Sequence, residues 1–447
     1  MNGKIPSELG TAKIGKLLRQ YAIPAIIAMT ASSLYNMVDS IFIGQGVGPY
    51  AISGLALTFP LMNLATAFGT LVGVGASTLL SVLLGQKNYE VARRVLGNVV
   101  ILNCIIGVVF ATFTLIFLDP ILYFFGASDQ TIGYARDYMV IILLGNVVTH
   151  IYFGLNSLLR SSGHPKQAMV ATILTVLLNA VLDPIFIFGL GWGIQGAAIA
   201  TVLAQCVSLA WIVRRFMDRN ELIHFEKGKF GLDWQIAKRS MSIGLAPFLM
   251  NFVSCFIVIF LNQSLKKYGG DLAIGAYGIV NRIIFLFLMI CMGLTQGMQP
   301  IAGYNFGAKQ YDRVKEVLWK TLGFAFGVMC IGFVICELFP KTVVAIFTTD
   351  DELIQNAAIG LRTVMMTFPL VGIQVVIGNF FQSLGYVGRA TFLSLSRQLL
   401  FLLPLLIFLP KFFEIRGVWL SLPVSDTISC IVAIILLGRF LKNFKTE

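Results

Sequence analysis

This sequence contains few charged residues and almost no histidine. Asp, Glu, Lys and Arg make up 12% of its 447 residues, whereas soluble domains carry roughly 25% charged residues. There is no Walker A motif and no HExxH motif, so the sequence gives no support for ATP-driven transport or for zinc hydrolysis. Its three histidines are scattered and form no cluster of the kind that a membrane enzyme needs. We therefore expect a membrane protein that is not an enzyme.

Long apolar segments dominate the chain. Hydrophobic residues make up 57% of it, and about twelve segments approach or exceed the roughly 20 residues that a helix needs to cross a bilayer. The seven cysteines lie in such segments without a CxxC pair, and we interpret them as buried small hydrophobic residues. The composition predicts an all-α membrane protein. Its predicted spans are 17–43, 52–84, 95–118, 136–158, 168–190, 194–216, 241–265, 273–302, 317–339, 357–384, 391–410 and 415–440.

The basic residues predict the topology. Of the 33 Lys and Arg residues, 24 fall in the termini and in the loops on one side of the predicted spans, and six fall in the loops on the other side. The other three (Arg282, Arg362 and Arg397) lie within spans, where they can face a cleft, snorkel or pair with acids. The positive-inside rule makes the richer side cytoplasmic, with both chain termini on it. The net charge of +12 is thus a topology signal rather than a sign of nucleic-acid binding.

The second half of the chain repeats the first at a spacing of about 222 residues. Each copy holds six predicted spans, so we expect two parallel, pseudo-symmetric six-helix lobes around a central cleft. The predicted lobes are 1–216 and 238–447, joined by a cytoplasmic linker at 217–237. The matching pairs include Gly75 and Gly297, Gly85 and Gly307, Lys87 and Lys309, Tyr89 and Tyr311, and Gly163 and Gly385.

Two carboxylates lie inside predicted spans of the first lobe. Asp39 lies in the first span and Asp183 in the fifth, and an intramembrane carboxylate costs several kcal/mol unless it is paired, hydrated or protonated. Asn179 shares a helix face with Asp183, and Thr201 on the next span can add a hydroxyl. These oxygen ligands suit Na⁺, and two close carboxylates at low dielectric can instead share a proton. The alternative is that each Asp only packs helices through hydrogen bonds.

The second lobe lacks these acids. Pro24 lies fifteen residues before Asp39, and Pro247 lies the same distance before Asn262, so an amide replaces the first carboxylate. Pro24 should kink the first helix, either passively or as a hinge coupled to Asp39. Asp426, in the last span, is interpreted as structural, either paired or facing water. Cation binding is therefore expected mainly in the first lobe.

With these features the chain resembles the multidrug and toxic compound extrusion (MATE) family, in its DinF/MepA-like branch. The resemblance implies that Asp39, Asn179, Asp183 and Thr201 form the cation site and that Pro24 is the bend of the first helix. It also places Tyr35 and Asn156 near the substrate cavity. The residues that carry the resemblance are Tyr35-Asn36-Met37-Val38-Asp39, the run from Leu178 to Pro184, the run from Gly196 to Thr201, and the run from Pro300 to Phe306.

The resemblance also implies a function. We expect an antiporter in the plasma membrane that exports small organic cations in exchange for a coupling ion, acts as a monomer and needs no cofactor. H⁺ is favoured over Na⁺, since partly desolvated carboxylates can titrate near neutral pH. The soft Met- and Phe-rich surfaces suit varied amphipathic ligands. The same two-lobe plan also allows a second function, a flippase for a lipid-linked precursor.

Overall fold

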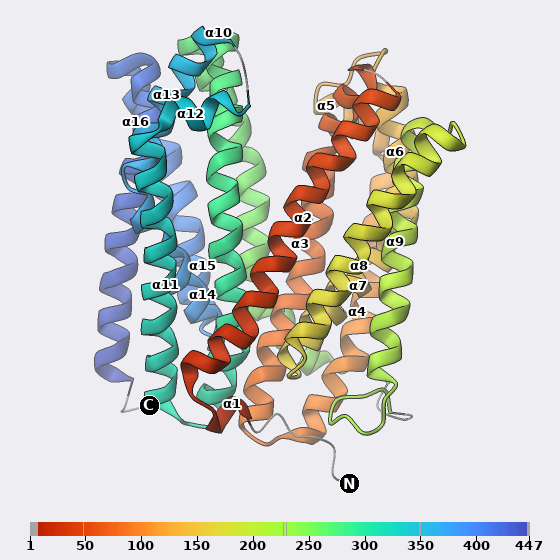
Figure 1. The fold of residues 1–447 in the computed structure, drawn as a ribbon. Helices are drawn as coiled ribbons and strands as arrows, with labels where there is room; N and C mark the ends of the chain where they lie inside the picture. Colours follow the sequence, from red (N-terminus) through yellow and green to blue (C-terminus); the bar gives the residue numbers. More distant parts are fainter. Residues whose placement is uncertain (1–7, 48, 227, 229, 348–349, 445–447) are drawn as a thin grey trace. The chain divides into compact units, whose positions relative to one another are not determined.

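The protein is all helical in the computed structural model, which describes residues 8–47, 49–226, 228, 230–347 and 350–444. No β-strand occurs among these residues, and long helices run side by side within each part of the molecule (Figure 1). The helices are α1 (Glu8–Thr11), α2 (Ile14–Gly46), α3 (Pro49–Gly85), α4 (Tyr89–Ile116), α5 (Leu118–Phe124), α6 (Ile132–Leu144), α7 (Asn146–Ser161), α8 (Pro165–Pro184), α9 (Gly193–Phe216), α10 (Trp234–Gly307), α11 (Tyr311–Leu338), α12 (Pro340–Ala345), α13 (Asp351–Met365), α14 (Phe368–Ser383), α15 (Val387–Leu395) and α16 (Leu403–Asn443), with π-helices η1 (Ile185–Gly189) and η2 (Ser396–Leu402).

The helices match the predicted spans. Eight helices among the described residues are long and apolar enough to cross a membrane, or up to ten if each of two bent pairs forms one span. The long α2 adds the first predicted span. Within α16 the backbone at Glu414 is not helical (φ 50°, ψ −131°) and separates the last two predicted spans. Gly270, at φ 69°, divides α10 in the same way. The prediction of an all-α membrane protein is confirmed.

The internal repeat is visible in the backbone. Lys87 and Lys309, which the repeat aligns, both adopt φ 59°, a left-handed conformation that is uncommon for a residue with a side chain. Gly163 and Gly385 also share a positive φ. The predicted spans 136–158 and 357–384 are each bent, between α6 and α7 by 55° and between α13 and α14 by 51°. The sequence analysis did not predict these bends, yet both copies contain one.

Packing divides the chain into two compact units. Unit 1 contains the described residues up to Ala12, then Ile27–Phe248 and Gly303–Lys309, whereas unit 2 contains Lys13–Ile26, Leu249–Ala302 and the residues from Gln310 onward. Most helices of each sequence half therefore pack within one unit, and the predicted linker lies within unit 1. α2 and α10 each run from one unit into the other.

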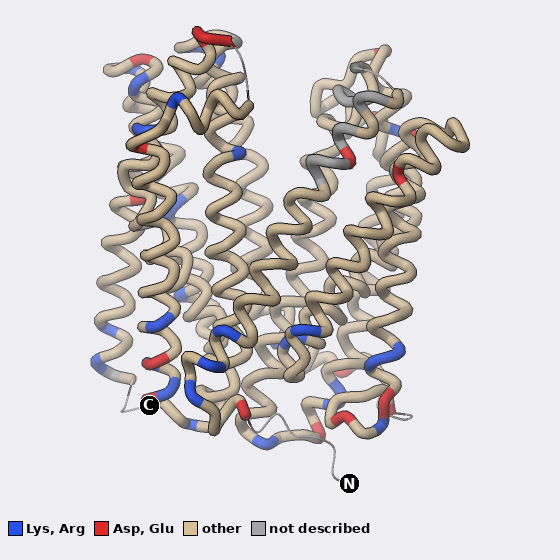
Figure 2. Tube along the Cα trace, in the orientation of Figure 1, with Lys and Arg blue, Asp and Glu red and all other residues tan. Residues whose placement is uncertain are grey.

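Each unit has its own helix contacts. In unit 1, α3 packs against α4, α6 and α7, and α8 packs against α7 and α9. In unit 2, α14 packs against α11 and α16, and α13 packs against α12 and α16. Within each unit most Lys and Arg lie toward one end of the helices (Figure 2), as the loop count predicts.

Glycines permit the closest helix contacts. A Cβ atom added at Gly75 of α3 would lie 1.8 Å from the backbone oxygen of Ser240 in α10, within unit 1. At the repeat position, a Cβ atom at Gly297 would lie 2.5 Å from the Cα atom of Ala22 in α2, within unit 2. Small residues that let helix backbones approach are the usual means of packing membrane helices.

Candidate functional site

The first two residues of the candidate site lie on α2. Tyr35 and Asp39 are four residues apart and share one face of the helix. The Asp39 side chain is buried, with 5% of the residue exposed. Pro24 lies inside the same helix, two residues before α2 leaves unit 2 at Ile26. Its predicted role as a hinge stays a prediction.

The next two residues lie at the end of α8. Pro165 begins this helix, where its missing N–H costs nothing. Pro184 closes it, and the chain continues as the π-helix η1. Asn179 and Asp183 occupy successive turns just before this change and are both buried, at 1% and 0% exposure. Such local departures from α-helix geometry are frequent at functional sites.

Thr201 joins these two helices from α9. Ala197, Ala198 and Ala200 are fully buried around it, and their small side chains allow α8 and α9 to approach closely. The Thr201 Oγ1 atom donates to the backbone oxygen of Ala197 at 3.1 Å and accepts from Asn179 Nδ2 at 3.1 Å. It also lies 3.1 Å from the Tyr35 hydroxyl. Since the single proton of Thr201 is already donated, Tyr35 donates this bond.

The two carboxyl groups meet at the centre of this group. Asp39 and Asp183 lie within hydrogen-bonding reach of each other. No described residue makes a hydrogen bond of good geometry to Oδ1 of Asp39 or to either side-chain oxygen of Asp183, and all three atoms are buried. The Asn179 side chain nevertheless lies close enough to Asp183 to interact with it. The Oδ1 atom of Asn179 is likewise buried without a donor. Two ionised carboxylates in this position repel each other, and a proton or another cation between them would relieve that repulsion.

Tyr138 is a site residue that the sequence analysis missed. It lies on α6 with 1% exposure. It lies close enough to both acids to interact with them electrostatically. Its position inside an apolar segment was the one available signal, and that signal does not say which neighbours the ring meets.

Asn156 lies in a second polar group. Its Nδ2 atom donates to the backbone oxygen of Ala168 at 3.1 Å and to Thr172 Oγ1 at 3.3 Å. Next to it, Thr175 Oγ1 donates across the helices to Ser208 Oγ at 2.8 Å. Thr172 is about 10 Å along α8 from Asn179 at 1.5 Å per residue. No hydrogen bond among the described residues therefore joins Asn156 to the carboxylate pair, and its place in a substrate cavity stays a prediction.

The structure also defines the surroundings of other polar residues in the membrane helices. His150 is fully buried and packs against Phe110. Asp426 is paired, which is one of the two alternatives expected: Arg397 Nε donates to its Oδ1 atom at 2.7 Å. Arg362 is paired with Glu337 at 2.9 Å.

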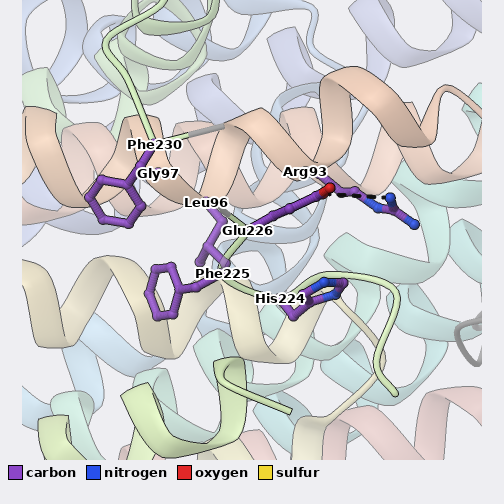
Figure 3. Close-up of a pocket in the computed structure, with 7 residues that line it drawn as sticks. All are labelled: Arg93, Leu96, Gly97, His224, Phe225, Glu226 and Phe230. Atoms are coloured by element: carbon purple, nitrogen blue, oxygen red, sulfur yellow. Dashed lines mark ion pairs between the residues drawn. The ribbon is translucent and has the colours of Figure 1, made fainter. Parts of the chain in front are cut away.

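The predicted linker contacts α4 within unit 1, beside a small pocket (Figure 3). Arg93 of α4 forms an ion pair with Glu226 at 3.7 Å and donates to the backbone oxygen of Leu222 at 3.2 Å. The pocket contains about 150 Å³ of empty space, open solvent included, which leaves no room for a drug-sized ligand. It is lined by Arg93, Leu96, Gly97, His224, Phe225, Glu226 and Phe230. We interpret it as the place where the linker is held rather than as a ligand site.

Comparisons with known proteins identify the family of the chain. A family model described as MatE matches residues 24–185 and 243–407. Multidrug export protein MepA of Staphylococcus aureus (strain MSSA476) is 28% identical over 425 residues, which cover 94% of this chain and 93% of MepA. A solved structure of the MATE multidrug transporter DinF-BH in complex with rhodamine 6G is 36% identical with a TM-score of 0.90, and 98% of each chain is covered.

The fold is shared more widely. The outward-facing conformation of a multidrug resistance MATE family transporter of the MOP superfamily matches 100% of both chains with a TM-score of 0.94 at 24% identity. The matched family model covers well over half of this chain and includes Asp39 and Asp183. The expected resemblance to the DinF/MepA-like branch is confirmed. The chain thus belongs to the MATE family of multidrug transporters and has its two-lobe, twelve-span membrane fold.

Proposed function

We propose that this chain is a secondary active antiporter that exports cationic amphipathic compounds in exchange for H⁺, bound at Asp39 and Asp183. One observation carries the proposal. Two buried carboxyl groups lie within reach of each other, and three of their four oxygens make no hydrogen bond of good geometry to a described residue. A structural pair of this kind is costly in a membrane. A site that gains and loses a cation during transport explains why the pair is present.

The pair links proton binding to cation binding. When both carboxyl groups are ionised, the site attracts an organic cation and favours conformations that separate or hydrate the acids. When a proton bridges them, the repulsion is relieved and the attraction for the organic cation falls. Each ligand thus binds better to a different state, which is the requirement for coupled exchange.

The hydrogen bonds at Thr201 favour H⁺ over Na⁺. A hydroxyl oxygen has one proton to donate and two lone pairs that accept. At Thr201 the proton goes to Ala197, and the lone pairs accept from Asn179 and Tyr35. Thr201 could therefore ligate Na⁺ only by losing a hydrogen bond. A proton shared by the two acids needs no such rearrangement.

The relatives support the substrate class. DinF-BH has been solved with the cationic dye rhodamine 6G, and MepA is named a multidrug export protein. For this chain we propose export of rhodamine 6G and similar lipophilic monocations. We also propose that it acts as a monomer in the plasma membrane, with both termini cytoplasmic and with no cofactor besides the coupling ion. The basic ends of the helices support this orientation.

Transport in liposomes tests the proposal. Purified protein should move rhodamine 6G when a pH gradient is imposed, and a Na⁺ gradient alone should have no effect. Asp39→Asn and Asp183→Asn should each abolish this exchange. Asp137→Asn, which changes an exposed acid of α6, is the matched control and should keep it. Exchange that requires Na⁺ and ignores the pH gradient would disprove H⁺ coupling.

Anionic substrates decide between the exporter and the flippase. A flippase for a lipid-linked precursor must carry a negatively charged headgroup, which the buried acid pair would repel. We therefore expect an anionic dye of matched size to be moved much more slowly than rhodamine 6G. Equal rates for the two dyes would support the flippase instead.

A further inference from the structure

Unit 2 contains an ion pair within its membrane helices that the cation-exchange proposal does not use. Arg397 on η2 donates from Nε to Asp426 Oδ1 of α16 at 2.7 Å. The Asp426 side chain is 5% exposed and that of Arg397 is 28% exposed. Charged side chains inside a membrane-spanning segment are costly and usually mark a functional site.

The surroundings of this pair come from several helices of unit 2. Gln398 Nε2 donates to Ser254 Oγ in the first half of α10 at 2.6 Å. Tyr277, in the second half of α10, lies close enough to interact with the charge of Arg397, and its ring is 6.1 Å from that of Trp419. The pair is therefore held in a polar and aromatic setting between α10, η2 and α16.

The repeat relates these helices to those of the cation site. A shift of about 222 residues aligns the first half of α10 with α2, the region of η2 with α8, and the second half of α16 with α9. α2, α8 and α9 hold the acid pair of unit 1. Arg397 and Asp426 themselves align with Thr175 and Gln205, which are neutral. The corresponding helices thus carry two acids in one unit and an acid with a base in the other.

Both members of the pair keep bonding capacity. A guanidinium group has five N–H donors, and Nε is the one through which Arg397 is bonded to a described residue. Its Nη atoms and Asp426 Oδ2 make no hydrogen bond to a described residue. They are also not fully buried, so they are open to the surroundings. The pair accordingly presents unused N–H donors next to an unused carboxylate oxygen.

We propose that the Arg397–Asp426 pair is a second substrate site, which binds amphipathic zwitterions that carry a carboxylate and an organic cation. The carboxylate binds the Nη groups of Arg397, and the cationic part lies against Oδ2 of Asp426. Since the pair is neutral overall, it accepts a neutral zwitterion without creating a net buried charge. The inference adds a second substrate class to the monocations of the proposed function. Transport of the zwitterion rests on the proposed function, whereas its binding at this site does not.

Two dyes that differ in one group test the inference. Rhodamine 6G is an ethyl ester and a cation, and the corresponding free acid is a zwitterion. Binding of each dye to the purified full-length protein is measured by fluorescence polarisation at one pH. Arg397→Gln should weaken binding of the free acid by about tenfold or more, as expected for the loss of a charge-assisted hydrogen bond. Binding of the ester should change by less than about twofold.

Two further variants separate binding from folding. Arg397→Gln combined with Asp426→Asn leaves no unpaired charge, so it should fold, and it should still bind the free acid weakly. Recovery of wild-type binding by this double variant would show that the single variant acted through an orphaned acid, and would overturn the inference. Arg362→Gln breaks the more exposed ion pair of α13 and α11 and should leave both dyes unaffected.

The outcomes are distinct from those that test the exchange proposal. An equal loss of binding for both dyes in Arg397→Gln, or no loss for either, would refute the zwitterion site. Failure of the exchange proposal would show instead as rhodamine 6G transport that survives Asp39→Asn and Asp183→Asn. Selective loss of the free acid would support the zwitterion site in either case.

Discussion

Neutralising both acids of the cation site should remove the pH dependence of cation binding. Asn has nearly the shape of Asp, so Asp39→Asn with Asp183→Asn keeps the packing around these buried residues and removes their charge. In the wild type, raising the pH removes the shared proton and adds one negative charge to the site. Affinity for an organic cation should therefore rise with pH in the wild type and stay constant in the double variant.

The size of the effect follows from the burial of the pair. Asp39 and Asp183 are 5% and 0% exposed, so screening by salt is weak. One unit charge about 6 Å from the cationic centre of the ligand contributes about 3 kcal/mol at an effective dielectric constant near 20. This energy corresponds to a change in affinity on the order of a hundredfold, which is in the range of typical coupling energies.

Fluorescence polarisation measures the affinity for rhodamine 6G at an acid and an alkaline pH. The ratio of the two affinities checks the predicted pH dependence in the wild type and in the double variant. The titrations are run without Na⁺ and repeated with it, so that competition by Na⁺ is measured separately. A neutral ligand of similar size is the control and should show no pH dependence in either protein. The reasoning is refuted if the double variant keeps the pH dependence of the wild type, or if the wild type shows none.

Three further predictions concern the supports of the site and the fold. Thr201→Val leaves two donors without their acceptor and should lower the free energy of unfolding by about 1–3 kcal/mol. Thermal denaturation in detergent measures this loss, and unchanged stability would contradict the hydrogen bonds assigned to this hydroxyl. Gly75→Val should greatly reduce the yield of folded protein in size-exclusion chromatography. Gly327→Val on α11 should not, because an added Cβ atom there meets nothing within 4 Å, and equal yields would contradict the close contact at Gly75. Arg93→Ala should increase proteolysis of the linker around Glu226 while rhodamine 6G binding is kept, and a loss of binding would mean that the pocket has more than a structural role.

Much of the site could be predicted because a membrane restricts where acids occur. Asp39 and Asp183 stood out since each interrupts a long apolar segment, and spacing along one helix joined Asn179 to Asp183. The structure brings Asp39, Asn179, Asp183, Thr201 and Tyr35 together. Whether they bind the coupling ion stays a prediction for the experiments above.

Other parts of the site had no comparable signal. Tyr138 is one of 13 tyrosines, and it meets the acids because of the way in which α6 packs against α3 and α9. Asn156 bonds to Ala168 and Thr172 because of the way in which α7 packs against α8. Hydropathy reports that a segment is in lipid, but the rotation of a helix about its axis depends on packing with its neighbours.

The sequence by itself determined the class of protein, the number and order of the spans, the repeat and the two acids of the first lobe. These follow from the length of apolar segments and from the cost of charge in lipid, which act on each segment separately. Tertiary structure alone decided that α2 and α10 each belong to both packing units, that Thr201 has no spare lone pair, and that Arg397 pairs with Asp426. These depend on contacts between residues far apart in the chain, whose geometry arises only when the helices pack together.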